Sequence, residues 1–352
     1  MSVRPVAPAF SPLDEQLGLS ASCGCSPRVL QWLVRLGAEL PFGRAASWLA
    51  ELTGVVVSAS TVRRQTEALG TTAVALGAAD VAHRQRTLPE PVAHPERLVL
   101  GADGAMVPLV GGEWAEAKLV SVGTPEQQGS TVRSTPLAYF ARLADAETFA
   151  TQALAELHRV GLDGAHAVAA VQDGAPWLQG FVDYHRPDAL RILDWPHAAE
   201  HLTDLAEAVM GPGTAHAKRA ATRLRTWLWQ EGPARMLQVL DAWVRACPDR
   251  PEVASAVAYF RERRTQLDYP AFRAAGWPVG SGATESGHKQ VMQARMKRAG
   301  MRWARPHVNP LLALSLLHHN DRWASDGPWY DSASSSALTV CASLAPNATC
   351  AT

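Results

Sequence analysis

The stretch AHAVAAVQDGAPWLQGFVDYHRPDALRILDW (165–195) decides the fold class of this chain. Its first part, AHAVAAVQD (165–173), is a short apolar run that predicts a buried strand ending at Asp173. APWLQGFVDYH (175–185) has the length and spacing of a helix, and ALRILDW (189–195) is a second apolar run. A strand, a helix and another strand within about 30 residues are typical of a parallel pair joined by a crossover helix.

The preceding residues extend this pattern into a sheet. RLVLGAD (97–103), EAKLVSVG (116–123) and TPLAYFARL (135–143) are strand-like, and DAETFATQALAELHRVG (145–161) is helical. Three strands followed by a helix, a strand, a helix and a strand predict an α/β fold whose sheet begins with an antiparallel meander.

Residues 1–95 form a predicted N-terminal helical region. SPRVLQWLVRLGAEL (26–40), PFGRAASWLAEL (41–52) and VVVSASTVRRQTEAL (55–69) each have helical spacing, and RTLPEPVAHPER (86–97) is Pro-rich and linker-like. A helix, a glycine turn and a Ser-capped helix carrying Arg63 and Arg64 indicate a helix-turn-helix-like DNA contact. A helical hairpin that only packs in a core is the alternative.

The pattern changes again after the sheet. Residues 197–275 are expected to be wholly helical, and GSGATESGHKQVMQARMKRAGMRW (280–303) begins with a Gly-Ser-Gly and continues as a basic helix. PLLALSLLHHNDRW (310–323) is a last apolar helix, whereas 325–352 is rich in Ser and Ala and is expected to be an unstructured tail.

Charge is segregated along the 352 residues although the net charge is zero. Residues 96–200 carry a net charge of −7 and residues 201–305 a net charge of +8. An acidic cluster beside a basic surface suits a metal-using enzyme that acts on a polyanion. Chance segregation on solvated faces is the alternative.

Composition narrows the possible locations of the protein. The longest apolar runs are shorter than the ~18 residues that a membrane span needs, and the first residues lack the apolar core of a signal peptide. Five scattered cysteines do not suggest a disulfide framework, and Cys23 and Cys25 lack a second pair for zinc. We therefore expect a cytoplasmic protein without a membrane partner.

Three acidic residues are the candidate catalytic groups. Asp103 and Asp173 each end a predicted strand and are followed by Gly-Ala. Carboxylates at the ends of neighbouring strands can converge, and Mg²⁺ prefers such oxygen ligands. Glu285, at the start of the basic helix, would complete a set for two Mg²⁺ or Mn²⁺ ions acting on a phosphodiester. A turn or a helix cap is the alternative for each acid taken singly.

Basic residues near these acids are candidate phosphate contacts. In the predicted helical segment the expected contacts are Lys218, Arg219 and Arg223. In the basic helix they are Lys289, Arg295, Lys297, Arg298 and Arg302. Trp303 follows them and fits either a core position or a stacking contact with a base.

Four stretches resemble one known family. They are LPFGRAASWLAELTGVVVSASTVRR (40–64), GADGAMVP (101–108), QDGAPWLQGFVDYHRPDALRILDWPHAAEHL (172–202) and GSGATESGHKQVMQARMKRAGMRW (280–303). With them the chain resembles bacterial insertion-sequence transposases of the DDE type, in particular the ISKra family, which is distantly similar to Mutator-like elements.

The resemblance implies a fold, an activity and a set of site residues. It implies an RNase H-like core in 96–196 and 276–324, interrupted by an all-α insertion in 197–275. It also implies cleavage and strand transfer at transposon ends by a homo-oligomer on DNA, with the metal triad at Asp103, Asp173 and Glu285. The family's Asp-x-x-His motif falls on Asp194 and His197.

Other readings remain open at this stage. Asp194 could simply cap the helix that follows it, and His197 with His201 has a spacing that can bind zinc. The alternative function is a truncated or decayed transposase that acts as a non-catalytic DNA-binding regulator. A nuclease that cleaves without strand transfer is a third possibility.

Overall fold

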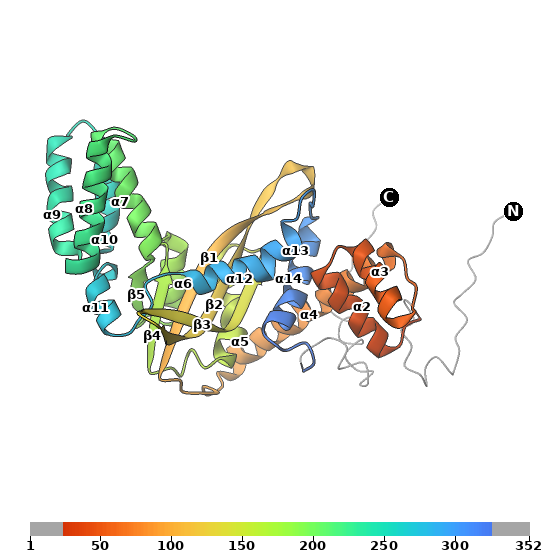
Figure 1. Ribbon diagram of the computed structural model, residues 1–352. Helices are drawn as coiled ribbons and strands as arrows, with labels where there is room; N and C mark the ends of the chain where they lie inside the picture. The colour runs from red at the N-terminus through yellow and green to blue at the C-terminus, as the bar shows by residue number, and fades with distance from the viewer. Residues whose placement is uncertain (1–23, 326–352) are drawn as a thin grey trace, which may run out of the picture. The chain divides into compact units, whose positions relative to one another are not determined.

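The computed structural model describes residues 24–325, so the expected tail, Cys23 and the first 22 residues lie outside the described part. The described residues belong to two compact units (Figure 1). Residues 24–76 and 291–325 form a helical unit, and residues 77–290 form a unit built on a sheet. Each unit is described separately below.

The sheet has five strands in the order β3-β2-β1-β4-β5. They are β1 (Arg97–Pro108), β2 (Trp114–Gln128), β3 (Thr131–Arg142), β4 (Ala167–Gln172) and β5 (Leu190–Leu193). The first three pair antiparallel, whereas β4 pairs in parallel with both β1 and β5. The predicted α/β class and the antiparallel meander are therefore confirmed.

Strand β1 is longer than its apolar pattern predicted. The expectation that Asp103 ends the strand is wrong, because β1 continues to Pro108. Its parallel pairing with β4 stops at Gly101, but its antiparallel pairing with β2 runs on to Pro108 opposite Trp114. Asp103 therefore lies inside β1, just past the point where β1 parts from β4.

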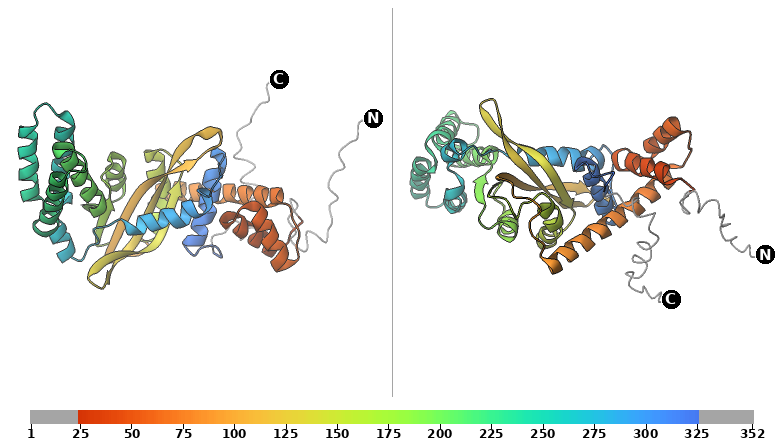
Figure 2. Two further views of the ribbon diagram at one scale, coloured as in Figure 1. Left: turned by 45° about the horizontal axis from the view of Figure 1, so that its top comes forward. Right: turned by 90° about the horizontal axis from the view of Figure 1, so that it is seen from below.

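Helices cover the sheet on both faces. On one face, α5 (Ala146–Arg159) and α6 (Pro176–His185) bury an aromatic group in which Phe149 lies 5.7 Å from Phe140 and 5.5 Å from Phe181 between ring centres. On the other face, α12 (Gly282–Gly287) lies across β1, β2 and β3 (Figures 1 and 2).

A helical bundle connects β5 to α12. Its elements are α7 (Trp195–Met210), α8 (Ala215–Glu231), α9 (Pro233–Ala246), α10 (Pro251–Glu262) and α11 (Tyr269–Ala274). Their apolar sides share one core with the sheet, in which Leu202, Leu224 and Val257 are packed together with Val99 and Val171. The bundle is thus anchored to β1 and β4.

The helical unit contains α2 (Pro27–Glu39), α3 (Phe42–Thr53), the start of α4 (Ala59–Thr87), the short α13 (Ala294–Met296) and α14 (Arg305–His319). Gly54, with φ of 74°, ends α3, and the Ser58 hydroxyl accepts a hydrogen bond from the Thr61 N–H at the start of α4. Leu33, Leu49 and Leu314 are fully buried in its core.

Helix α4 extends well past the predicted end at residue 69. Gly70 lies within the helix, at a place where another chain segment comes close to it. A Cβ at Gly70 would lie 2.5 Å from the Pro310 carbonyl oxygen. The residues that follow are rich in alanine, which favours helix, and the next proline is Pro89.

The pKa of His185, on α6 of the sheet-based unit, predicts how the stability of that unit responds to acid. Its Nε2 donates to the Ala150 carbonyl oxygen at 3.0 Å, and burial lowers the pKa of the imidazole from 6.5 to about 4. A depressed pKa gives stability that is complete above pH 6.5 and is lost as the pH falls towards 4. The loss is at most about 3 kcal/mol.

We therefore expect His185→Gln to flatten the fall in urea midpoint between pH 7 and pH 4.5, because glutamine keeps a donor but does not titrate there. The matched control is His166→Gln, since the His166 side chain is 63 % exposed. An equally steep fall in His185→Gln and wild type would contradict the assignment.

Candidate active site

Asp103 and Asp173 occupy equivalent places on neighbouring parallel strands. Gly101 of β1 lies opposite Val171 of β4, and each aspartate follows its partner by two residues. Paired neighbouring strands are about 5 Å apart, and here the pairing ends at Gly101 and Val171, with Asp173 following the last residue of β4. The structure thus places both predicted site residues just beyond the paired ends of neighbouring strands, with the Asp103 side chain 47 % exposed.

A short hydrogen bond to the local backbone orients each aspartate. The Gly104 N–H donates to Asp103 Oδ1 at 2.6 Å, and the Ala175 N–H donates to Asp173 Oδ1 at 2.8 Å. The second bond closes a turn through Gly174, whose φ of +84° is in the left-handed region. The Gly that follows Asp173 is therefore required by the turn.

Helix α12 is seated on the same face of the sheet. A Cβ on Gly101 would lie 2.2 Å from the Thr284 hydroxyl oxygen, so only glycine leaves room for the helix there. The Thr284 and Ser121 hydroxyls are hydrogen-bonded at 2.9 Å. These contacts hold Thr284 over the residue two positions before Asp103, and Glu285 comes next in the chain.

The Glu285 side chain itself points into solvent. It is 57 % exposed, and its Oε2 lies 3.9 Å from Lys289 Nζ, which is a solvent-exposed pair one helical turn apart. Within residues 24–325, no three His, Cys, Asp or Glu side chains are gathered closely enough to hold a metal ion. Carboxylate oxygens are the ligands that a hard cation such as Mg²⁺ prefers.

His288 is a site residue that the sequence patterns missed. Its Nε2 lies 3.3 Å from Asp103 Oδ2 without the geometry of a hydrogen bond. The side chain is only 6 % exposed, and Nδ1 has no hydrogen-bond partner among the described residues. The signal available in the sequence was its position four residues after Thr284, which places both on one helix face.

Asp194 joins three segments at the end of β5. Its Oδ2 accepts from the His197 N–H at 3.2 Å, which confirms that it caps α7. Its Oδ1 accepts from the Ser281 N–H at 2.7 Å, in the Gly-Ser-Gly segment before α12. Burial raises the pKa of Asp194 above the usual value, although these hydrogen bonds oppose the rise. The residue is a cap and also an anchor for the segment that carries Glu285.

His197 and His201 meet one turn apart on α7. Their Nε2 atoms are 2.9 Å apart, and the His201 ring stacks on Tyr259 with ring centres 4.7 Å apart. Burial, and then the neighbouring His197, lowers the pKa of His201. Burial also raises the pKa of Tyr259 to about 12, which keeps its phenol protonated as a donor.

The predicted DNA contacts differ in exposure. Most are surface residues: Arg63 and Arg64 on α4, Lys218, Arg219 and Arg223 on α8, and Lys289, Lys297 and Arg302 further along the chain. Arg298 is half-buried, and its Nε donates to the Ala294 carbonyl at 2.6 Å.

Arg295 requires a correction. It was expected to bind phosphate, but the structure buries it, with 3 % exposed. Its guanidinium lies between two rings, 4.8 Å from the centre of Phe42 and 4.7 Å from that of Trp303. Burial lowers its pKa to about 10. Trp303 is likewise buried, as the core alternative predicted.

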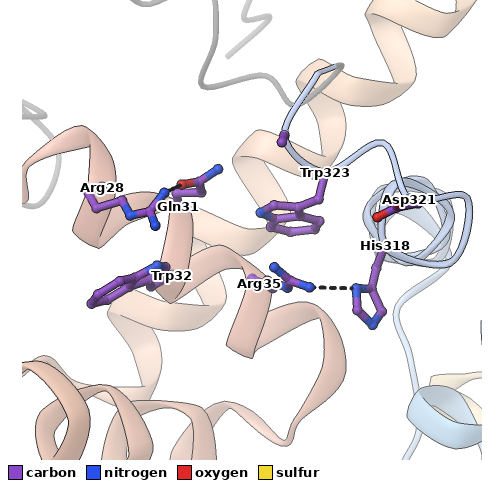
Figure 3. Close-up of a pocket in the computed structure, with 8 residues that line it drawn as sticks. Arg28, Gln31, Trp32, Arg35, His318, Asp321 and Trp323 are labelled. Carbon is purple, nitrogen blue, oxygen red and sulfur yellow. Dashed lines mark hydrogen bonds between the residues drawn. The ribbon is translucent and has the colours of Figure 1, made fainter.

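The helical unit also has a surface cavity of about 210 Å³ (Figure 3). One side comes from α2, with Arg28, Trp32 and Arg35. The other comes from His318 of α14 and from Trp323, which follows that helix. Arg35 Nη2 lies 3.2 Å from His318 Nδ1. Trp32 is 40 % exposed, so the lining offers guanidinium groups beside an accessible indole. Such a lining suits an anion that carries an aromatic ring.

No known family model matches the chain, and the curated proteins include no significant match. Among residues 24–325, no helix combines the length and apolarity that crossing a membrane requires.

Proposed function

We propose that the chain is a DDE transposase that cleaves DNA and transfers strands at the ends of an insertion sequence. The observation that carries the proposal is that Asp103 and Asp173 each follow, by two residues, the last paired positions of neighbouring parallel strands, and that α12, which carries Glu285, packs on β1. The strand order β3-β2-β1-β4-β5 supports an RNase H-like core, and the bundle α7–α11 supports the expected all-α insertion between the second and third acids.

Asp103, Asp173 and Glu285 would hold two Mg²⁺ or Mn²⁺ ions. When bound, such ions supply activation of a water or a 3′-hydroxyl and stabilise charge on the phosphate under attack. Asp194 holds the Gly-Ser-Gly segment, and with it α12, against the end of β5. His197, paired with His201, offers an imidazole beside this segment for contact with the DNA backbone.

The test is a nicking assay with supercoiled plasmid DNA, the full chain and Mg²⁺ or Mn²⁺. The plasmid should carry the DNA that flanks the reading frame, because terminal inverted repeats would supply the natural substrate. Nicks at the repeat ends, followed by joined products, support a transposase. DNA binding without nicks would support the non-catalytic regulator instead, and nicks without joining would support a nuclease.

The bundle should contribute non-specific DNA affinity. Lys218, Arg219 and Arg223 lie exposed on α8. We expect the triple change to Gln to weaken binding of any duplex, and to lower the slope of log affinity against log salt by about 2 to 3, because each phosphate contact contributes about 0.9. Binding is measured by fluorescence anisotropy at several salt concentrations.

Arg261→Gln is the control for this series. Arg261 is exposed on the same bundle, but its guanidinium pairs with Asp241 at 2.6 Å. An unchanged salt slope in the triple variant would show that the bundle does not lie along DNA.

A further inference from the structure

Two side chains at the C-terminal end of α10, Tyr259 and the C-cap residue Arg263, hydrogen-bond to the backbone directly after β4. The Tyr259 hydroxyl donates to the Asp173 carbonyl oxygen at 2.7 Å. Arg263, four residues later, donates to the Gly174 carbonyl oxygen from Nη2 at 2.8 Å and from Nε at 3.2 Å. Two consecutive carbonyl groups, beginning with that of the candidate metal ligand, are therefore held by the end of a helix in the bundle.

Tyr259 and Arg263 also contact each other. Arg263 Nη1 donates to the Tyr259 carbonyl oxygen at 3.1 Å, and the guanidinium lies 4.0 Å from the centre of the Tyr259 ring. This arrangement fixes the guanidinium fork, so that both of its bonds to Gly174 form in one geometry.

Only glycine at position 174 leaves room for Tyr259 and Arg263 to approach the backbone so closely. A Cβ at that position would lie 2.7 Å from Arg263 Nε and 3.0 Å from the Tyr259 hydroxyl oxygen. Any other residue would push Arg263 away and would also be strained at a φ of +84°. The glycine thus serves both the turn and the close approach of α10.

The hydrogen bonds from Arg263 affect the Asp173 carboxylate through the turn that joins them. Asp173 Oδ1 accepts from the Ala175 N–H, and that N–H belongs to the peptide group whose carbonyl oxygen, on Gly174, is held by Arg263. Fixing this peptide plane fixes the direction of the N–H, and the N–H in turn orients the carboxylate. Tyr259 also stacks on His201, so the same ring touches the His197–His201 pair.

We propose that Tyr259 and Arg263 are positioning residues that orient the Asp173 carboxylate for metal binding, which makes α10 a working part of the active site. This inference rests on the proposed function. It predicts that removing the hydrogen bonds of Tyr259 or Arg263 weakens metal affinity, while the bundle stays folded and keeps its DNA contacts.

The experiment uses the full chain and measures Mn²⁺ affinity by calorimetry together with the Mg²⁺ dependence of nicking. Tyr259→Phe removes one hydroxyl and keeps the stacked ring. Loss of one hydrogen bond should weaken Mn²⁺ binding about 3- to 10-fold and raise the Mg²⁺ needed for half-maximal nicking by a similar factor. Saturating Mg²⁺ should restore most of the nicking rate.

A second variant and two controls keep the test decisive. Arg263→Gln, which loses the fork, should weaken Mn²⁺ binding at least as much as Tyr259→Phe. The controls Tyr184→Phe and Arg261→Gln change exposed residues and should leave both measurements at wild-type values. A thermal melt establishes that each variant is folded.

The outcomes separate this inference from the proposed function. Wild-type Mn²⁺ affinity in both folded variants overturns the inference, and so does a wild type that binds no Mn²⁺. Weakened Mn²⁺ affinity in a protein whose wild type never nicks DNA supports the positioning role and counts against the transposase activity alone.

Discussion

Asp173→Asn should lower the rate of metal-dependent nicking by at least about 1,000-fold, with Asp103→Asn close behind. The amide is nearly the same size as the carboxylate but lacks the charge that a divalent cation requires. A loss of about 4 kcal/mol of transition-state stabilisation corresponds to this factor. Both variants should lose nicking together, because the proposal assigns both carboxylates to the same pair of metal ions.

The measurement compares nicking of supercoiled plasmid by wild type and variants at equal concentration, with DNA binding followed separately. Asp249→Asn, at an exposed position, is the control and should nick like wild type. Nicking by Asp173→Asn within tenfold of the wild-type rate would remove Asp173 from the metal-binding set.

Glu285→Gln tests the third acid of the proposed metal site. Its carboxylate is 57 % exposed and points towards Lys289, so its role depends on a change of rotamer when metal and DNA arrive. We expect the same loss of nicking, with DNA affinity retained. Wild-type nicking by Glu285→Gln would leave the two aspartates in place and require another third ligand.

Local sequence pattern predicted the strands at which two of the three candidate acids lie. Asp173 follows an apolar run that predicted a buried strand, and β4 confirms it; β4 pairs in parallel with β1, the strand that contains Asp103. Glu285 was identified as the third acid of the set, although no described contact joins it to the two aspartates. The end of β1 was mispredicted because Gly104 resembles a turn residue, whereas antiparallel pairing with β2 carries the strand past it.

The residues that were missed act through contacts distant in sequence. Tyr259 is 86 residues from Asp173, a separation at which local periodicity carries no information. His288 reaches Asp103 only because α12 lies across β1. Arg295 was mispredicted for the same reason, since a basic residue in a basic helix gives no sign that Phe42 and Trp303 enclose it.

Asp194→Ala should reduce both stability and nicking, because one carboxylate satisfies two backbone donors in separate segments. Its side chain is buried, and its loss leaves the Ser281 N–H without its acceptor. Burial offsets part of these hydrogen bonds, as its raised pKa indicates, so we expect a loss of about 2 kcal/mol in the free energy of unfolding. Chemical denaturation at neutral pH provides the measurement.

Asp145→Ala is the matched control, because Asp145 caps a helix but does not hold a second chain segment in place. Asp145 caps α5 through the Thr148 N–H at 2.8 Å in a solvent-exposed setting, and its loss should cost about 1 kcal/mol. If Asp194 also positions α12, Asp194→Ala should lose nicking well beyond Asp145→Ala at temperatures where both are folded. Equal nicking by the two variants would reduce Asp194 to a helix cap, and the Gly-Ser-Gly segment would then need another means of holding Glu285 near β1.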